Sequence, residues 1–383
     1  MTASLNVNGW PKCQSCGKVN ILSGSSDLFE QPNDVETFIK NMVKGKRLTV
    51  TKVRDSSVHL QLGHLLNRYP YASVDKIYRM TRKGGLIGSI NTVWYTLEYM
   101  EENKIIDNPR CVIKNCRNYT NMHYILKIED SKESMSSFIT RYKNYIDMVH
   151  SMNAYRETYL YVKTHGTLSI PDKFQILEEC TWSNFIPIIP HSTAEKGLSD
   201  ALKAEPEAES VLDDFTVDEQ LEWDNETWET FHWLCVNYRM SYTDLGKLIQ
   251  KSPQAAYRRK LVINQSVILW YPIFIGGQQS YELLFFSFET KFPSFFAEVL
   301  SKNTGVSYLI QTSERTTLFV NTTIPKVVNS AMSRYEDTGI IRDLRRMYLH
   351  NYWDPIVERY MEGSIPERYF YMFKIGNKKG KRR

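Results

Sequence analysis

The hydrophobic and polar positions of the second half of the chain follow helical spacing first and strand spacing later. Four apolar residues recur at i, i+3, i+7 and i+10 and predict an amphipathic helix over 225–238. A short helix over 242–249 and a third over 253–262 are expected to follow, the third started by Ser252-Pro253. Three helices with a tight turn before the third predict a helix-turn-helix. The apolar stripe consists of Trp228, Phe231, Cys235 and Tyr238.

Downstream of the third helix the pattern becomes β-rich. Residues 267–275 are predicted to form the wing of a winged helix-turn-helix. The order that follows is strand, helix, strand, strand, helix, strand, which is the ferredoxin-like arrangement. The predicted strands are 281–289, 306–312, 317–321 and 340–349, and the predicted helices are 292–302 and 325–337.

The first half repeats this order more loosely, which indicates a duplicated unit. Helices are predicted over 58–67 and 74–81, with a third capped by Ser89, and wing strands near 111–114. Strands (123–129, near 152–155, 158–164, 185–189) and helices (132–148, 171–179) would complete its ferredoxin-like part. The predicted fold class is therefore α+β, with tandem winged helix-turn-helix domains, each followed by a ferredoxin-like βαββαβ domain.

A stretch rich in Ala, Glu, Ser and Asp, residues 191–222, separates the two halves and is predicted to be an acidic linker. The boundaries that follow from this division are an N-terminal extension with a CxxC pair (1–50), a first winged helix (51–117), a first ferredoxin-like domain (118–190), the linker, a second winged helix (223–280), a second ferredoxin-like domain (281–352), and a C-terminal extension with a basic tail (353–383).

The uneven charge bears on the kind of partner. The linker holds ten acidic residues and two lysines, a net charge of −8, and removing this from the total of +5 leaves +13 for the rest. A basic folded portion favours a polyanionic partner such as DNA, although a charge that serves only solubility is the alternative. The tail from Lys374 to Arg383 would add sequence-independent affinity for phosphate, or is simply solvated.

Composition also limits the compartment. The longest uncharged apolar run, Val267 to Gly277, is about half of the ~20 residues that a membrane span needs. The N-terminus shows no basic start followed by an apolar run, so no signal peptide is expected. We therefore predict a soluble, cytoplasmic protein without a membrane partner.

Residues 239–261, RMSYTDLGKLIQKSPQAAYRRKL, closely resemble the helix-turn-helix of the Lrp/AsnC family of prokaryotic transcription regulators. The resemblance covers about 110–120 residues of the second half well. It covers the first half only by pattern, where residues 95–106 are most similar to the recognition helix and the residues that follow it. It implies a regulator with a ferredoxin-like effector and dimerisation (RAM) domain, a small-molecule effector and a homodimer. The family's Gly-Asp-apolar-Asp turn is replaced here by Thr312-Ser313-Glu314-Arg315-Thr316, so the effector site is unknown.

The candidate DNA-binding residues lie mainly on the predicted third helix of the second half. Arg and Gln side chains pair with guanine and adenine edges in the major groove, and a helix N-terminus binds phosphate. Tyr257 and Leu261 are expected to face inward, with Lys260 near the edge. The alternative to DNA recognition is an ordinary solvent-exposed basic helix without a binding role. The candidates of this half are Ser241, Tyr242, Ser252, Gln254, Arg258, Arg259 and Lys260.

The first half offers a weaker recognition surface. Its third helix ends in Glu98, Glu101 and Glu102, whose charge DNA repels, so this copy either binds weakly or is structural. Its candidates are Arg79, Arg82, Lys83, Asn91, Thr92 and Tyr95.

Six cysteines in a chain of this length do not indicate a disulfide framework, and a reducing compartment is expected. Cys13 and Cys16 have the spacing of half a zinc knuckle, and Cys111 and Cys116 are the other close pair. Four thiolates would suffice for a structural zinc ion, while two unrelated reduced pairs are the alternative.

The sequence lacks the phosphate-binding loop, the HExxH motif and the GxSxG motif. The prediction is accordingly a regulator without a catalytic site, without a cofactor other than such a zinc ion, and with double-stranded DNA as its partner. Two alternatives stay open. One is a siroheme-decarboxylase-like enzyme on the same fold, which would need basic and His side chains lining a tetrapyrrole cleft. The other is an interaction module in which the winged helices bind proteins.

Overall fold

The computed structural model describes residues 17–18, 53, 55–83, 89–129, 134–154, 157–210, 212, 216–217, 219–355, 358 and 372. Cys13, Cys16 and the basic tail from Lys374 to Arg383 lie outside these ranges. Within them, no helix is both long enough and apolar enough to cross a membrane.

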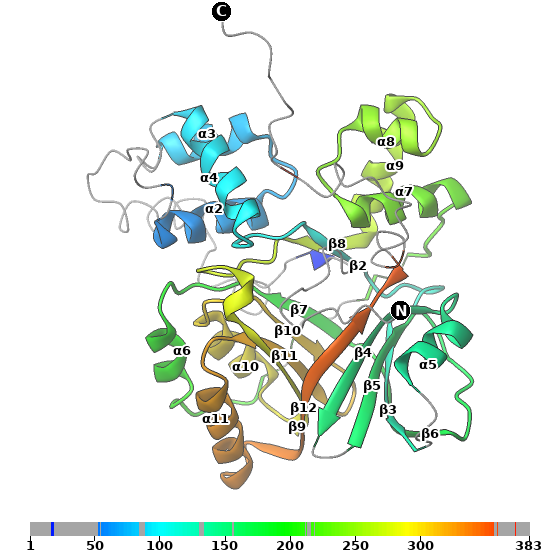
Figure 1. Cartoon of the computed structure of the whole chain (residues 1–383), viewed down its shortest axis with the longest axis vertical. Coiled ribbons are helices and arrows are strands. Elements are labelled where there is room, and N and C mark those ends of the chain that lie inside the picture. The colour runs from blue at the N-terminus through cyan, green and yellow to red at the C-terminus, as the bar shows by residue number, and fades with distance from the viewer. Residues whose placement is uncertain are drawn as a thin grey trace, which may run out of the picture.

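Two three-helix units lie side by side at one end of the molecule (Figure 1). The first contains α2 (Ser56–Arg68), α3 (Val74–Lys83) and α4 (Ile90–Glu102). The second contains α7 (Asn225–Val236), α8 (Tyr242–Leu248) and α9 (Pro253–Ser266). Their starts follow local chemistry, since Ser89, Ser241 and Ser252 each accept a backbone N–H of the first turn. The six helices predicted for these two units are thus confirmed.

The strands that follow the helical units pair with each other instead of forming wings. β2 (Arg110–Ile113) is antiparallel to β8 (Val267–Trp270), and β1 (Gly17–Lys18) runs parallel to β8. The predicted β-structure over 267–275 is present as a strand only up to Trp270, and the winged arrangement is not confirmed. A wing folds back on its own unit, whereas here each short buried strand satisfies its hydrogen bonds with the strand of the other unit.

Beneath the helical units, both halves contribute to one nine-stranded sheet, ordered β6-β3-β5-β4-β12-β9-β11-β10-β7 (Figure 1). The second half has the βαββαβ order predicted for it. Its elements are β9 (Glu282–Thr290), α10 (Pro293–Ser301), β10 (Ser307–Gln311), β11 (Thr316–Thr322), α11 (Pro325–Asp337) and β12 (Ile341–Trp353). A 3₁₀ turn, η3 (Gln278–Ser280), precedes β9.

The first half departs from that order. Its elements are β3 (Met122–Ile128), α5 (Met135–Tyr142), β4 (Ile146–Ala154), β5 (Glu157–Thr164), β6 (Phe174–Thr181) and β7 (Asn184–Ile188). The helix predicted over 171–179 is wrong, because β6 pairs along the whole of β3. Tertiary pairing here overrides a local sequence that favours a helix.

The two edges of the sheet are consecutive in sequence. Only Trp182 and Ser183 separate β6 from β7, yet these strands are the first and the last of the nine. The Trp182 backbone N–H donates to Asn121 next to β3, and that of Ser183 donates to Gln311 of β10. The sheet therefore curls until its edges meet, and the two halves face each other across a shared interior.

Helices cover the outer faces of this sheet. α10, α11 and α6 (Glu195–Ala201) pack on the second half, and α5 packs on the first. The stretch 191–222 is thus more than a linker. It contributes α6 and three residues buried in the core of the second half, namely Leu198, Leu202 and Leu212. Leucines between the acidic residues carry this packing.

Buried histidines make acid sensitivity a property of this fold. Burial lowers the pKa of His64 and of His150 to about 3, and that of His191 to about 4. The unfolded chain takes up these protons below about pH 6.5, while the folded chain stays neutral, so stability falls as the pH drops from 6.5 toward 4. We predict that His64→Gln reduces the loss of unfolding free energy between pH 7 and pH 5 by about 1–2 kcal/mol, measured by urea denaturation.

The matched comparison for this variant is His165→Gln, because the pKa of His165 is raised. Its removal should leave the acid-induced loss undiminished. An identical pH dependence for His64→Gln and the unaltered chain would contradict the assignment.

Candidate functional site

A pocket of about 490 Å³ lies between α7 and the sheet of the first half. One wall is the face of α7 that carries Trp228, Phe231, His232 and Cys235. The opposite wall comes from the start of β4 and the end of β5, and Tyr119 lies between them. This is the volume of a small-molecule site, typically about 300–1,000 Å³. The residues from the sheet are Ile146, Asp147, Met148, Lys163 and His165.

Three ionisable side chains are linked inside the pocket. Asp147 Oδ2 forms an ion pair with Lys163 Nζ at 3.1 Å, and Asp147 Oδ1 is hydrogen-bonded to His165 Nδ1 at 3.0 Å. Burial alone would raise the pKa of Asp147, but Lys163 and the His165 hydrogen bond lower it to about 2. The same hydrogen bond outweighs desolvation and raises the pKa of His165. The Asp147 carboxylate therefore lies between two cationic groups, and Asp354, which accepts from Tyr352, is a second carboxylate in the pocket lining.

An aromatic wall borders this charged cluster. The Tyr119 ring stacks on His165, with centroids 5.7 Å apart and planes 8° from parallel, and lies 6.0 Å from the Trp228 ring. Burial raises the pKa of Tyr119 well above its usual value, so its hydroxyl stays protonated. Cationic groups beside aromatic faces suit a ligand that is both planar and anionic.

Lys163 also borders a second, smaller cavity of about 40 Å³. Its ammonium lies 5.4 Å from the centroid of the Trp182 ring, and only 2% of the residue is exposed. His150, Trp270 and Tyr308 line the far side. This volume holds about one water molecule. The cavity is therefore too small to be a separate ligand site.

A separate ionic network fills the interior between the two halves of the sheet. Glu178 Oε1 accepts from His123 at 2.8 Å, while Oε2 accepts from Ser287 and lies 3.2 Å from Arg315 and 3.3 Å from Arg345. Burial would raise the pKa of Glu178, but His123 and Arg315 lower it. Residues of both halves thus hold one buried carboxylate.

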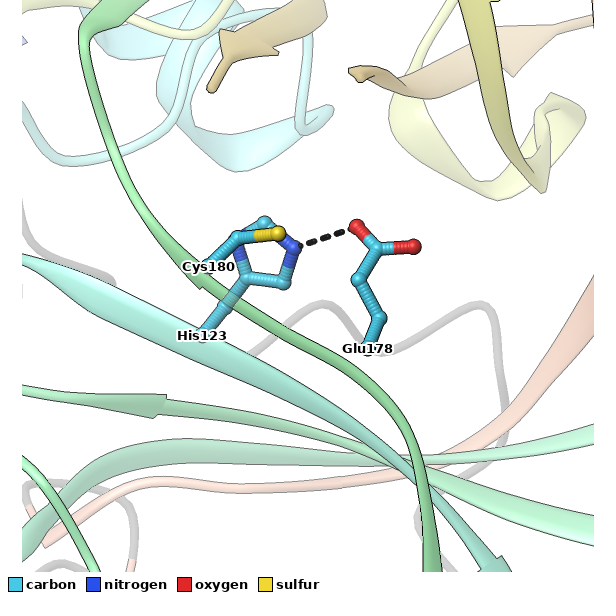
Figure 2. Close-up of side chains that lie close together, drawn as sticks. All are labelled: His123, Glu178 and Cys180. Carbon is cyan, nitrogen blue, oxygen red and sulfur yellow. Dashed lines mark hydrogen bonds and ion pairs between the residues drawn. The ribbon is translucent and has the colours of Figure 1, made fainter. Parts of the chain in front are cut away.

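Figure 2 shows Cys180 beside His123 and Glu178, a trio whose ligand atoms all lie within 4.8 Å of one another. The hydrogen bonds around His123 decide whether a metal fits. Trp182 Nε1, which can only donate, bonds to His123 Nδ1 at 3.0 Å. A metal-bound histidine needs its proton on the other nitrogen, facing an acceptor. Here that nitrogen faces a donor, so the trio does not fit a metal ion.

The structure separates the candidate DNA-binding residues of the second unit into two groups. Ser241, Tyr242, Ser252, Gln254 and Arg258 are exposed. Arg259 pairs with Asp224 and Glu226 of the neighbouring helix α7, so its charge is already compensated.

Lys260 is 7% exposed and donates to the backbone oxygen of Tyr238, and burial lowers its pKa to about 7. The expected inward direction of Tyr257 and Leu261 is wrong as well, since both are 44% exposed. Helix α9 is rotated so that Ala256, Lys260 and Ile263 face the core.

In the first unit, Arg82, Lys83, Asn91 and Tyr95 are exposed and Thr92 is partly exposed. Arg79 is exposed too, but it pairs with Asp75 at 2.6 Å on the same helix. Glu101, expected on the recognition surface, is buried.

The structure describes only two of the four cysteines of the predicted zinc site, Cys111 and Cys116. Cys111 is disulfide-bonded, whereas Cys116, Cys180 and Cys235 are free thiols. The expectation that the cysteines are all reduced is therefore wrong for Cys111. Since Cys13 and Cys16 lie outside the described residues, a four-cysteine zinc site stays a prediction for the reduced chain only.

Sequence reasoning missed the pocket residues, although one signal was present. Tyr159, Tyr161 and Lys163 alternate along β5, which places the lysine on the face of two buried aromatic residues. A lysine on such a face needs a partner. Its partner Asp147 comes from the adjacent strand, and only the strand pairing reveals it.

No protein-family model matches the chain, and no curated protein does. The crystal structure of the siroheme decarboxylase NirDL is similar at 6% identity, over 80% of this chain and 97% of that one, with a TM-score of 0.41. Its co-complex with an iron-uroporphyrin III analogue gives 6% identity, 85% and 97% coverage and a TM-score of 0.35. Likeness at this level assigns no activity to this chain.

These comparisons do change one expectation. The prediction that the chain is not an enzyme is contradicted, because the neighbours found are described as an enzyme, and it is withdrawn. The resemblance to Lrp/AsnC regulators is untested by them and stays a prediction.

The interior network yields a stability prediction. Glu178→Ala should remove the buried carboxylate next to Arg315 and Arg345 while Asp343 still pairs with both, and lower the unfolding free energy by about 3 kcal/mol, the lower end for a broken buried ion pair. Urea denaturation measures this loss. Cys180→Ala, in the same cluster, should cost less than about 1.5 kcal/mol because it removes no charge. Equal losses for both variants would contradict the network.

Proposed function

We propose that this chain binds a planar small molecule bearing carboxylates in the pocket between α7 and the sheet, as a siroheme-decarboxylase-like protein. The observation that carries the proposal is the set of cationic groups, Lys163 and His165, beside the rings of Tyr119 and Trp228. This combination is what the sequence-based alternative required of a tetrapyrrole cleft.

Charge decides how such a ligand would be held. Asp147 occupies the position of a ligand carboxylate between Lys163 and His165, so a bound carboxylate would share or displace these contacts. Lys143 adds a further cation at the rim. The macrocycle would lie against the aromatic wall, where burial of apolar area supplies most of the affinity.

The proposed reaction also needs a proton donor, and the pocket contains one candidate. In that reaction the bond from carbon to carboxylate breaks, carbon dioxide leaves, and the carbon takes up a proton. His165, kept protonated by Asp147, is a group that can donate it, while Lys163 binds the departing carboxylate.

Binding of uroporphyrin III, which is planar and carries several carboxylates, tests the pocket. We predict that Lys163→Met weakens binding by about tenfold or more, the loss expected for a buried charged contact. Quenching of tryptophan fluorescence measures the affinity. The control Lys291→Met removes an exposed lysine paired with Glu209, away from the pocket, and should leave the affinity unchanged.

The raised pKa of His165 gives this binding a pH dependence. His165 is charged at pH 6 and loses its proton as the pH rises through its raised pKa, so uroporphyrin III should bind more tightly at pH 6 than at pH 8.5. His165→Gln should flatten this difference. Unchanged affinity in both variants would rule out the pocket as the site.

A second candidate function, which we propose on the sequence resemblance, is binding of duplex DNA by the two helix-turn-helix units. One observation favours it: α9 begins at a Ser-Pro cap and exposes Gln254 and Arg258 on its first turns. Arg82 and Lys83 of the first unit would contact phosphates. A homodimer, a small-molecule effector and the choice between DNA and protein partners stay predictions.

Substituting the adjacent residues Arg258 and Arg259 one at a time tests the proposed DNA binding. Arg258→Ala should weaken binding to genomic fragments and lower the slope of log affinity against log salt by about 1. Arg259→Gln, which removes a charge already paired with α7, should change the slope less. Binding that is insensitive to salt in every variant would favour a protein partner.

A further inference from the structure

Helix α7 carries the pocket on one face and contacts α9 on the other. Relative to Glu226, the four pocket residues of α7 lie at helical rotations of about 140° to 240°, at about 100° per residue. Glu226 is therefore on the opposite side of the helix from Trp228, His232 and the rest of the pocket wall.

The contacts on that opposite side are ionic. Glu226 Oε1 pairs with Lys251 Nζ at 2.8 Å, and its other oxygen pairs with Arg259. Asp224, which caps α7, lies 3.5 Å from Arg259. Lys251 immediately precedes Ser252, the N-cap of α9, and Arg259 lies in the middle of that helix. These ion pairs therefore join the start of α7 to both the start and the middle of α9.

The second unit otherwise has separate attachments. Arg239 donates to Tyr271 and to the backbone of Ala72 in the first unit, and Lys260 is fixed within its own unit by Tyr238. None of these groups lines the pocket. Among the contacts described, the acidic end of α7 is thus a direct link from the pocket wall to the exposed face of α9.

We propose that occupancy of the pocket is linked through α7 to α9, so that a ligand held at Lys163 stabilises α9 against local opening. The inference rests on the proposed function of the pocket. A ligand bound between α7 and the sheet fixes the position of α7, and the Glu226 pairs pass this restraint to α9. Linkage of this kind is reciprocal, so whatever α9 binds would alter affinity in the pocket.

Hydrogen exchange of the backbone amides of 253–266 tests the link in the full chain, with and without saturating uroporphyrin III. In the unaltered protein, exchange in α9 should slow by about fivefold, at the lower end of typical coupling. Glu226→Gln should bind the porphyrin with unchanged affinity, since this side chain does not line the pocket, but should lose most of the response of α9, because only the longer Asp224–Arg259 pair remains.

The matched control is Glu229→Gln, an identical change at an exposed position of the same helix. It should retain both binding and response. Lys251→Gln, which removes only one of the pairs, should reduce the response partly and serves if Glu226→Gln does not fold.

The possible outcomes distinguish failure of the link between α7 and α9 from failure of the proposed ligand pocket. Saturable binding with no change in α9, or a full response in Glu226→Gln, would overturn the link while the pocket stands. The absence of saturable binding would overturn the pocket and the link together.

Discussion

Everything in this molecule depends on β12 pairing with strands of both halves. Its residues Ile341 to Tyr348 pair with β9, and Tyr348 to Trp353 pair with β4. This strand joins the two repeats into a continuous sheet, and β7 of the first half joins them a second time by pairing with β10. Because β6 and β7 then lie at opposite ends of that sheet yet follow each other in sequence, the sheet must curl. The curl creates the interior in which residues of both halves meet.

That interior explains how so many charged groups can be buried. Glu178 comes from an edge strand of the first half, while Arg315 and Arg345 come from the second. Asp343, in the bulge of β12, accepts from Arg315 as well and has a positive φ of 47°. A bulge redirects a strand and exposes backbone groups, and here the backbone oxygen of Asp343 also accepts from Arg315. The network therefore favours one relative arrangement of the two halves of the sheet over other arrangements.

The same association produces the pocket. Neither half contains it alone, since α7 belongs to the second half, whereas Asp147, Lys163 and His165 belong to the first. Helix α7 supplies aromatic and apolar residues, while the strands of the first half supply the Asp147, Lys163 and His165 cluster. Helix α7 lines the pocket and also belongs to the second helical unit. It therefore connects the proposed ligand site with the proposed DNA surface.

The sequence by itself determined the helices of both units, the βαββαβ order of the second half and the position of the caps, because apolar spacing and N-terminal Ser and Pro residues act locally. It could not determine that 174–181 forms a strand, that Arg258 is exposed while Arg259 is paired, or that Lys163 meets Asp147. Those features depend on partners distant in sequence. Hydrogen bonding between strands and compensation of buried charge are tertiary interactions, and only the folded chain brings those partners together.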